Sequence, residues 1–128
     1  MSHPILYLDR SAIHPGREVE LREAVSHLMA FVEDQQPQLL AYGVSIDDSS
    51  HAMVVSAIHP DSASLERHLA IGGDEFRKVG RYIQLQSIEV VGPVSERAVE
   101  QLERKAAALG EGVSIHVSGV TAGFSRLG

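Results

Sequence analysis

The chain has 128 residues, 44% of them hydrophobic, and a formal net charge of −6, which fits one domain with an ordinary core. The acidic balance argues against a nucleic-acid partner, because phosphate neutralisation requires clustered Lys and Arg. The sequence has no cysteine, which excludes disulfides, a thiolate nucleophile and a cysteine metal site. It shows no signal-like start and no apolar run of the roughly 20 residues that cross a bilayer. We therefore expect a cytoplasmic protein with no membrane partner.

The first half of the chain alternates strands with one long helix. Residues 5–13 predict a strand with odd-numbered side chains on one face and even-numbered side chains on the other. After a turn at His14-Pro15-Gly16, residues 17–36 have apolar side chains at helical spacing, and Pro37 ends that helix. Residues 39–46 and 52–59 predict two more strands joined by a polar hairpin loop.

The second half adds helices with clear end signals. Asp61 or Ser62 can cap a helix that meets Gly72-Gly73, where a break or kink and a second helical piece are expected. Residues 85–91 predict a fourth strand. Ser95 then caps a third helix, with Gly110 in the position that usually follows a helix end, and residues 113–117 predict a short fifth strand.

The resulting order is β-α-β-β-α-β followed by α-β. Its first six elements match the split β-α-β pattern of ferredoxin-like domains, with both helices on one face of a four-stranded antiparallel sheet. The prediction is thus a single α+β domain, with a core over residues 5–91 and a C-terminal helix–strand extension over residues 95–128.

The strands are apolar on both sides, as in Val54-Val55 and Val90-Val91. An exposed apolar sheet face is an association hazard, and two such faces packed together would form a shared core. This pattern predicts a homodimer through the sheet faces. The alternative is that the third helix covers the second face within one monomer.

The element order, the two-sided apolar strands and the helix Ser62-Ala63-Ser64-Leu65-Glu66-Arg67-His68 followed by Phe76 resemble the dimeric α/β-barrel superfamily. Within it, the chain is similar to the antibiotic-biosynthesis-monooxygenase-like proteins over residues 5–91. Residues 95–128, including Gly123-Phe124-Ser125-Arg126, resemble an extension in uncharacterised members. The resemblance implies a pocket between sheet and helices in each monomer. Members with known activity oxygenate phenolic or quinol-like compounds with dioxygen, without metal or flavin, and others degrade haem or act on reactive metabolites.

His68 matches the histidine that recurs on this helix in the family, so it is the first candidate for a catalytic base or a substrate hydrogen-bond partner. Cofactor-free oxygenation requires a base tuned near neutral pH, and histidine titrates there. The alternative for His68 is a structural bond to a nearby carbonyl or carboxylate. His59 ends its strand just before Pro60, where it could line the same pocket or lie in a solvated turn.

Five further residues are candidates for substrate binding. Tyr7, Tyr42 and Tyr82 could donate phenolic hydrogen bonds to a substrate oxygen, although tyrosine hydroxyls more often lie at the surface. Phe76 could line the pocket or pack the core. Glu89 lies in an apolar strand, where an inward position would raise its pKa and make it an acid or base, and a position at the rim is the alternative.

No metal or cofactor is expected. The seven histidines include no helical pair four residues apart with a glutamate, and no glycine-rich phosphate loop occurs. The chain also lacks tryptophan, which several active members place beside the substrate. The predicted function is a small-molecule pocket protein of the monooxygenase-like group, acting on a phenolic or quinol-like compound without a cofactor. The alternative is a non-catalytic ligand-binding or structural homodimer.

Overall fold

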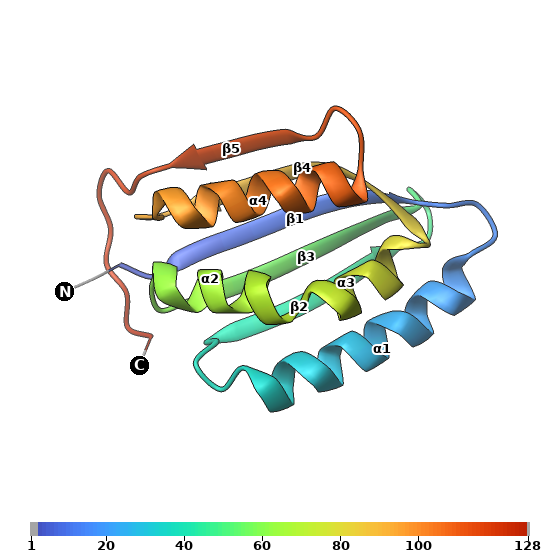
Figure 1. Ribbon diagram of the computed structural model, residues 1–128, viewed down its shortest axis with the longest axis horizontal. Helices are drawn as coiled ribbons and strands as arrows, with labels where there is room; N and C mark the ends of the chain where they lie inside the picture. Colours follow the sequence, from blue (N-terminus) through green and yellow to red (C-terminus); the bar gives the residue numbers. More distant parts are fainter. Residues whose placement is uncertain (1–2, 128) are drawn as a thin grey trace.

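The computed structural model describes residues 3–127. In chain order the elements are β1 (Ile5–Ile13), α1 (Glu18–Gln35), β2 (Ala41–Asp47), β3 (Ala52–His59), α2 (Ser62–Ile71), α3 (Gly73–Gly80), β4 (Ile83–Val91), α4 (Glu96–Leu109) and β5 (Ser114–Ser118). The strands form one sheet in the order β2-β3-β1-β4-β5 (Figure 1). The first four strands are antiparallel, and β5 joins β4 in parallel. The predicted α+β ferredoxin-like order with a helix–strand extension is confirmed.

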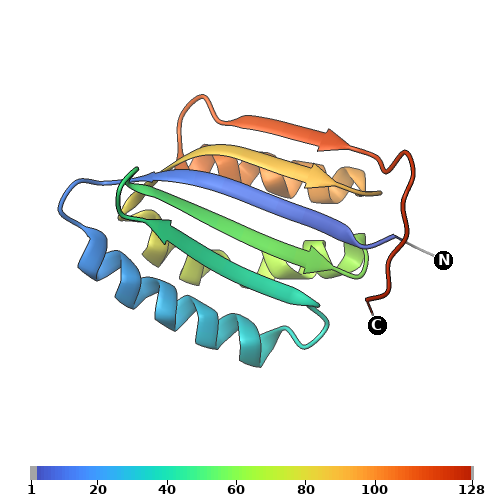
Figure 2. The same ribbon diagram turned by 180° about the vertical axis from the view of Figure 1, so that it is seen from behind.

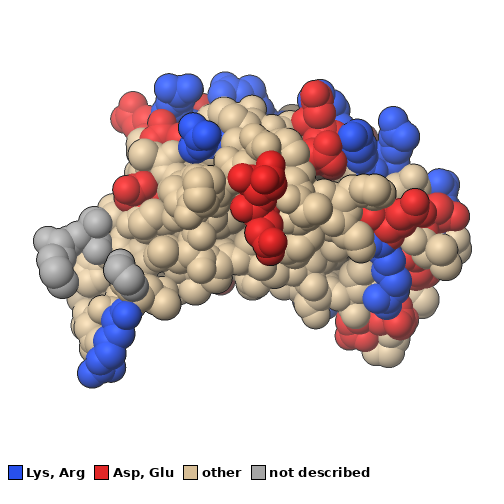
Figure 3. All heavy atoms as spheres, turned by 90° about the horizontal axis from the view of Figure 1, so that it is seen from below, with Lys and Arg blue, Asp and Glu red and all other residues tan. Residues whose placement is uncertain are grey.

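The helices lie together on one face of the sheet, which leaves the other face open (Figures 1 and 2). Helix α4 packs beside α2, so the expectation that it might cover the second face is wrong. On the open face, Leu6 and Leu8 of β1 are 46% and 45% exposed. Seen from the side of α1, most charged side chains lie along one edge and at one end of the molecule, an acidic group stands in the middle of the view, and the surface around that group consists of other residues (Figure 3). None of the helices within residues 3–127 is long and apolar enough to cross a membrane.

Strand β1 alternates as the sequence predicts. Ile5, Tyr7 and Asp9 are buried under the helices, and the side chains between them point to the open face. Strand β1 keeps this alternation to Ile13, whereas β4 does not, because the register between the two strands shifts at Arg10/Ser11 and leaves Gln86 of β4 without a partner in β1. The extra residue of such a bulge changes the face on which the following side chains lie, and Glu89 consequently falls on the open face.

The helical segment after β3 is divided into α2 and α3 at Gly72, as expected. Asp61 caps α2 by accepting a hydrogen bond from the Ser64 backbone N–H at 2.9 Å. The Phe76 ring lies against Gly72 so closely that a Cβ there would be 2.5 Å from the ring Cζ atom. The glycine therefore allows the first turn of α3 to place Phe76 over the sheet.

Gly110 follows α4 for a different reason from the one expected. Its φ of −166° is extended backbone, not the left-handed conformation that usually favours glycine at a helix end. A Cβ on Gly110 would lie 2.3 Å from the carbonyl oxygen of Leu85. The close approach of the chain to β4 is what excludes a side chain here.

Candidate functional site

Two histidines meet under the helical layer. His59 is the last residue of β3, and His68 lies on α2, which begins three residues later. Because α2 runs back across the sheet, the centroids of the two rings lie 5.5 Å apart. Their exposed fractions are 0% and 2%, so His59 does not lie in a solvated turn.

Each histidine is oriented by a polar side chain. His59 Nδ1 lies 2.8 Å from Ser64 Oγ, and no described group bonds its Nε2 atom. His68 Nδ1 lies 2.9 Å from Oε1 of Gln36, which is 2% exposed at the C-terminal end of α1. Since the amide oxygen is an acceptor, Nδ1 of His68 carries the hydrogen and Nε2 carries the lone pair. The carbonyl that His68 bonds is thus the side-chain amide of Gln36.

Aromatic rings surround His68. The centroid of its ring lies 5.3 Å from that of Tyr42 on β2 and 5.1 Å from that of Phe76 on α3, both in tilted contact. These two contacts come from two separate elements, and they fix the position of the His68 ring.

A polar cluster lies beside the aromatic group. Tyr7 donates its hydroxyl hydrogen to Asp9 Oδ2 at 2.5 Å, and Lys105 Nζ on α4 donates to the Tyr7 hydroxyl at 2.7 Å and to Asp9 Oδ2 at 3.2 Å. The side chains of Lys105 and Asp9 are 12% and 4% exposed. Lys105 Nζ also lies 4.7 Å from the centroid of Phe76, a cation–π distance.

The surroundings keep both histidines neutral. Burial lowers the pKa of His59 to about 4, against a raising effect of Asp61 and with a smaller lowering effect of Lys105. Burial, then the positive charge of Lys105, then the neighbouring His59, together lower the pKa of His68 to about 2. With its pKa lowered in this way, His68 is neutral and can accept a hydrogen bond through Nε2, and its role as a catalytic base stays a prediction.

The two tyrosines of the cluster stay protonated. Burial, and then the Asp9 carboxylate, raise the pKa of Tyr7 well above its ordinary value. The same two causes raise the pKa of Tyr42. Both hydroxyl groups are consequently hydrogen-bond donors throughout the physiological range.

A small cavity of about 30 Å³ lies between the sheet and the helices. Asp9, Tyr42, Phe76 and Lys105 contribute to its lining together with apolar core side chains. His68 is not part of the lining and reaches the cavity only through its contacts with Tyr42 and Phe76. A volume of this size holds about one water molecule.

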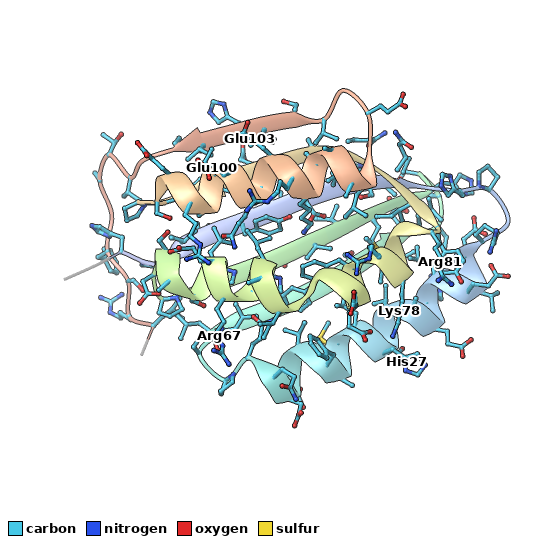
Figure 4. The ribbon with its side chains drawn as sticks, in the orientation of Figure 1. His27, Arg67, Lys78, Arg81, Glu100 and Glu103 are labelled. Carbon is cyan, nitrogen blue, oxygen red and sulfur yellow. The ribbon has the colours of Figure 1, made fainter. Side chains whose placement is uncertain are left out.

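The structure brings together five of the seven predicted site residues: Tyr7, Tyr42, His59, His68 and Phe76. The other two lie elsewhere. Tyr82 packs under Arg17, whose Cζ is 4.8 Å from the ring centroid, in a groove between α1 and α3 that His27 also lines (Figure 4). Glu89 is exposed on the open face of the sheet.

Sequence reasoning missed three residues of the site: Asp9, Gln36 and Lys105. Asp9 could have been found as an acidic residue on the inward face of a strand, between Tyr7 and Ser11. Gln36 and Lys105 carry no such local signal, because each reaches the site through tertiary packing. Within residues 3–127, no three His, Asp or Glu side chains are grouped so that they could hold a metal ion.

The fold is that of the antibiotic-biosynthesis-monooxygenase-like proteins. No family model matches the sequence, and no curated protein matches it. Among solved structures, MupZ from Pseudomonas fluorescens is similar, with 19% identity and a TM-score of 0.68 over 98% of this chain and 91% of that chain.

Two other solved structures extend the comparison. SnoaB from Streptomyces nogalater, a cofactor-independent oxygenase, has 16% identity and a TM-score of 0.59 over 72% of this chain and 94% of its own. A candidate antibiotic biosynthesis monooxygenase from Caulobacter crescentus CB15 has 19% identity and a TM-score of 0.57 over 73% of this chain and 92% of its own. These likenesses establish a shared fold, and the predicted resemblance is confirmed at that level.

Proposed function

We propose that this chain is a small-molecule-binding protein of the monooxygenase-like group that oxygenates a phenolic or quinol-like compound without a cofactor. The observation that carries the proposal is the buried Tyr7–Asp9–Lys105 cluster beside a pair of neutral histidines. The fold shared with a cofactor-independent oxygenase supports the same class of reaction.

The proposed reaction needs no external reductant. A substrate that has lost a proton passes one electron to dioxygen, and the substrate radical and superoxide combine to a hydroperoxide. Loss of water converts the attacked ring C–H carbon into a carbonyl, which gives a hydroxyquinone, so one oxygen atom stays in the product and the other leaves as water. The deprotonated substrate and superoxide each carry a negative charge. A fixed cation in a dry site stabilises such species strongly.

Lys105 is suited to this role. Its ammonium group is held by Tyr7 and Asp9 and lines the cavity, so it would stabilise a substrate anion and superoxide without reorientation. His68 lies behind Tyr42 and Phe76, so it would accept a hydrogen bond from a substrate hydroxyl through Nε2 only after Phe76 has moved. Because its pKa is about 2, the ring binds a proton weakly, and formation of the anion depends on the cation more than on the histidine.

The size of the cavity favours the alternative function. A volume of about 30 Å³ has no room for a phenolic ring, so a substrate would have to displace Phe76 and Leu109. If these side chains stay in place, the chain is a non-catalytic ligand-binding or structural homodimer.

Oxygen uptake with a panel of quinols separates the two functions. The proposal predicts uptake of one O₂ for each hydroxyquinone formed, without hydrogen peroxide and insensitive to chelators, and a loss of about 100-fold in kcat for Lys105→Met. Lys78→Met removes an exposed lysine from α3 and should retain full activity. Absence of uptake above buffer across the panel would favour the non-catalytic alternative.

For the assembly, we propose a homodimer through the open sheet face. This face holds a shallow groove of about 590 Å³ lined in part by Leu6, Leu8, Ile58 and Val91. A second copy of the same apolar face is a matching occupant, since two sheets pack well face to face. Sedimentation at micromolar concentration should give about twice the monomer mass.

A pair of variants tests the interface. Leu8→Glu places a charge in the middle of the proposed interface and should give a monomer. Val19→Glu makes the same type of change on α1, where the side chain is 78% exposed, and should leave the dimer intact. A wild-type protein that sediments as a monomer would rule out the shared sheet core.

A further inference from the structure

A second, larger hollow lies outside the cavity, between α2–α3 and α4. It is a groove of about 490 Å³, to which α4 contributes Arg97, Gln101, Arg104 and Lys105. Apart from the adjacent Arg104 and Lys105, these positions are three, four, seven or eight residues apart, so they share one side of the helix. The acidic Glu100 and Glu103 of the same helix lie on the side turned away from α2 (Figure 4).

The groove is strongly basic in an acidic protein. Four of the chain's 11 Lys and Arg residues line it, and no Asp or Glu does. Three of the four have acidic partners: Arg97 Nε lies 3.7 Å from Glu66 Oε1, Arg77 pairs with Asp74, and Lys105 pairs with the buried Asp9. Arg104 is exposed and makes no ion pair with any residue in the described range 3–127.

The remaining lining is apolar and leads inward. Leu69, Ala70 and Ala108 form part of the groove wall. Phe76, Lys105 and Leu109 line both the groove and the inner cavity, so they are the partition between the two. A molecule with a charged end and an apolar body could therefore place the charge among the arginines and the body against this partition.

We propose that the groove binds an organic oxyanion, a carboxylate or phosphate joined to an apolar body. Arg77, Arg97 and Arg104 hold the charged end, and the apolar body lies on Leu69 and Leu109 towards Phe76. Guanidinium groups are well suited to this task because they bind carboxylate and phosphate in a two-point geometry. Binding in the groove does not depend on the function proposed above. A further step, in which the bound anion passes Phe76 and enters the cavity as substrate, does rest on that function.

Three naphthalene compounds provide a direct test. They are 2-naphthoate, 2-naphthyl phosphate and the uncharged 2-naphthol, and binding is followed by naphthalene fluorescence in the absence of any turnover. We expect at least one anion to bind about tenfold more tightly than 2-naphthol, since hydrogen bonds between a guanidinium and an anion are stronger than those to a neutral hydroxyl. The preference should shrink with added salt. Which anion binds more tightly identifies the charged group.

A matched pair of charge reversals locates the binding. Arg104→Glu should raise the Kd of the preferred anion about tenfold or more and leave the Kd of 2-naphthol within about twofold. Arg67→Glu is the control, because Arg67 is also an exposed helical arginine with no ion pair among the described residues and lies on the opposite side of α2 (Figure 4). Circular dichroism verifies the fold of each variant, and Arg104→Gln, with a smaller loss in the same direction, replaces Arg104→Glu if that variant does not fold.

The proposal is overturned if 2-naphthol binds as tightly as both anions, if no anion binds at millimolar concentration, or if the two reversals weaken binding equally. Its failure is distinguishable from failure of the proposed oxygenation. Oxygen uptake with quinols but no preference for the anions would support the proposed oxygenation and refute the anion site in the groove. Anion binding that depends on Arg104, without oxygen uptake, would support the anion site in the groove and refute the proposed oxygenation.

Discussion

Lys105 on α4 donates a hydrogen bond to the hydroxyl of Tyr7 on β1 at 2.7 Å, across 98 positions of the sequence. The same ammonium group lies 3.2 Å from Asp9 Oδ2. The C-terminal extension is thus part of the candidate site, because its helix supplies the cation that this site would otherwise lack. Removing that cation has consequences for stability as well as for chemistry.

Lys105→Met should destabilise the protein by about 3 kcal/mol. The substitution keeps most of the apolar stem but leaves the Asp9 carboxylate buried without its cation, and breaking one partner of a buried pair typically costs about 3–5 kcal/mol. Urea unfolding of the wild type and the variant measures the difference.

Two further variants show whether the unpaired carboxylate is the cause. Adding Asp9→Asn to Lys105→Met should recover part of the loss, because the buried charge is removed. Lys78→Met breaks an exposed pair with Glu75 and should change the free energy of unfolding by less than about 1 kcal/mol. Equal losses for Lys105→Met and Lys78→Met would contradict the role given to Asp9.

The buried histidines should make stability fall as the pH falls from 7 to 5. The unfolded chain takes up protons on both rings near pH 6.5, whereas the folded protein resists protonation until about pH 4 for His59 and about pH 2 for His68. Because the unfolded state binds more protons in this range, unfolding becomes more favourable with acid, by roughly 2 kcal/mol for each ring at pH 5.

Unfolding by urea at pH 7 and pH 5 tests this slope. His68→Gln should unfold with a weaker dependence on pH than the wild type, since one of the two rings is gone. His27→Gln, which removes an exposed histidine from α1 (Figure 4), should retain the wild-type slope. A slope that is unchanged in His68→Gln would show that the ring is protonated equally in both states.

Much of the fold followed from the sequence because its signals are local. The alternation in β1, the cap at Asp61 and the break at Gly72 each depend on neighbours within a few residues. The face covered by α4 had no such signal. Its apolar stripe packs beside α2, and only the tertiary arrangement decides between the two faces of the sheet.

The site followed from the sequence only in part. His59 and His68 were recognisable because one ends a strand and the other lies on the buried side of the next helix. Lys105 was not, because a lysine on an amphipathic helix is normally solvated, and here it is drawn inward by Asp9, which lies 96 positions away. The low pKa of His68 likewise depends on its burial and on Lys105, so no reading of the helix alone could predict it.

Gln36→Glu should raise the pKa of His68. The substitution exchanges the amide oxygen 2.9 Å from Nδ1 for a carboxylate, and a neighbouring negative charge favours the imidazolium form. NMR titration of the ring resonances measures the shift. Gln35→Glu places the same charge one residue earlier, on the exposed side of α1, and should leave those resonances with their wild-type pH dependence. A response that is the same in both variants would mean that Gln36 does not orient the ring.

The contact between Gly72 and Phe76 gives a last prediction. Gly72→Ala would place a Cβ 2.5 Å from the Phe76 ring, so the ring must move, and we expect a loss of about 1–3 kcal/mol in the free energy of unfolding. Gly73→Ala is the matched control, because its Cβ would approach only the flexible end of Arg77, at 3.7 Å, and alanine favours the helix. Combining Gly72→Ala with Phe76→Leu should lose less than the sum of the two single changes, because the obstructing ring is absent. Additive losses would show that the glycine is needed for the backbone and not for the ring that separates the groove from the cavity.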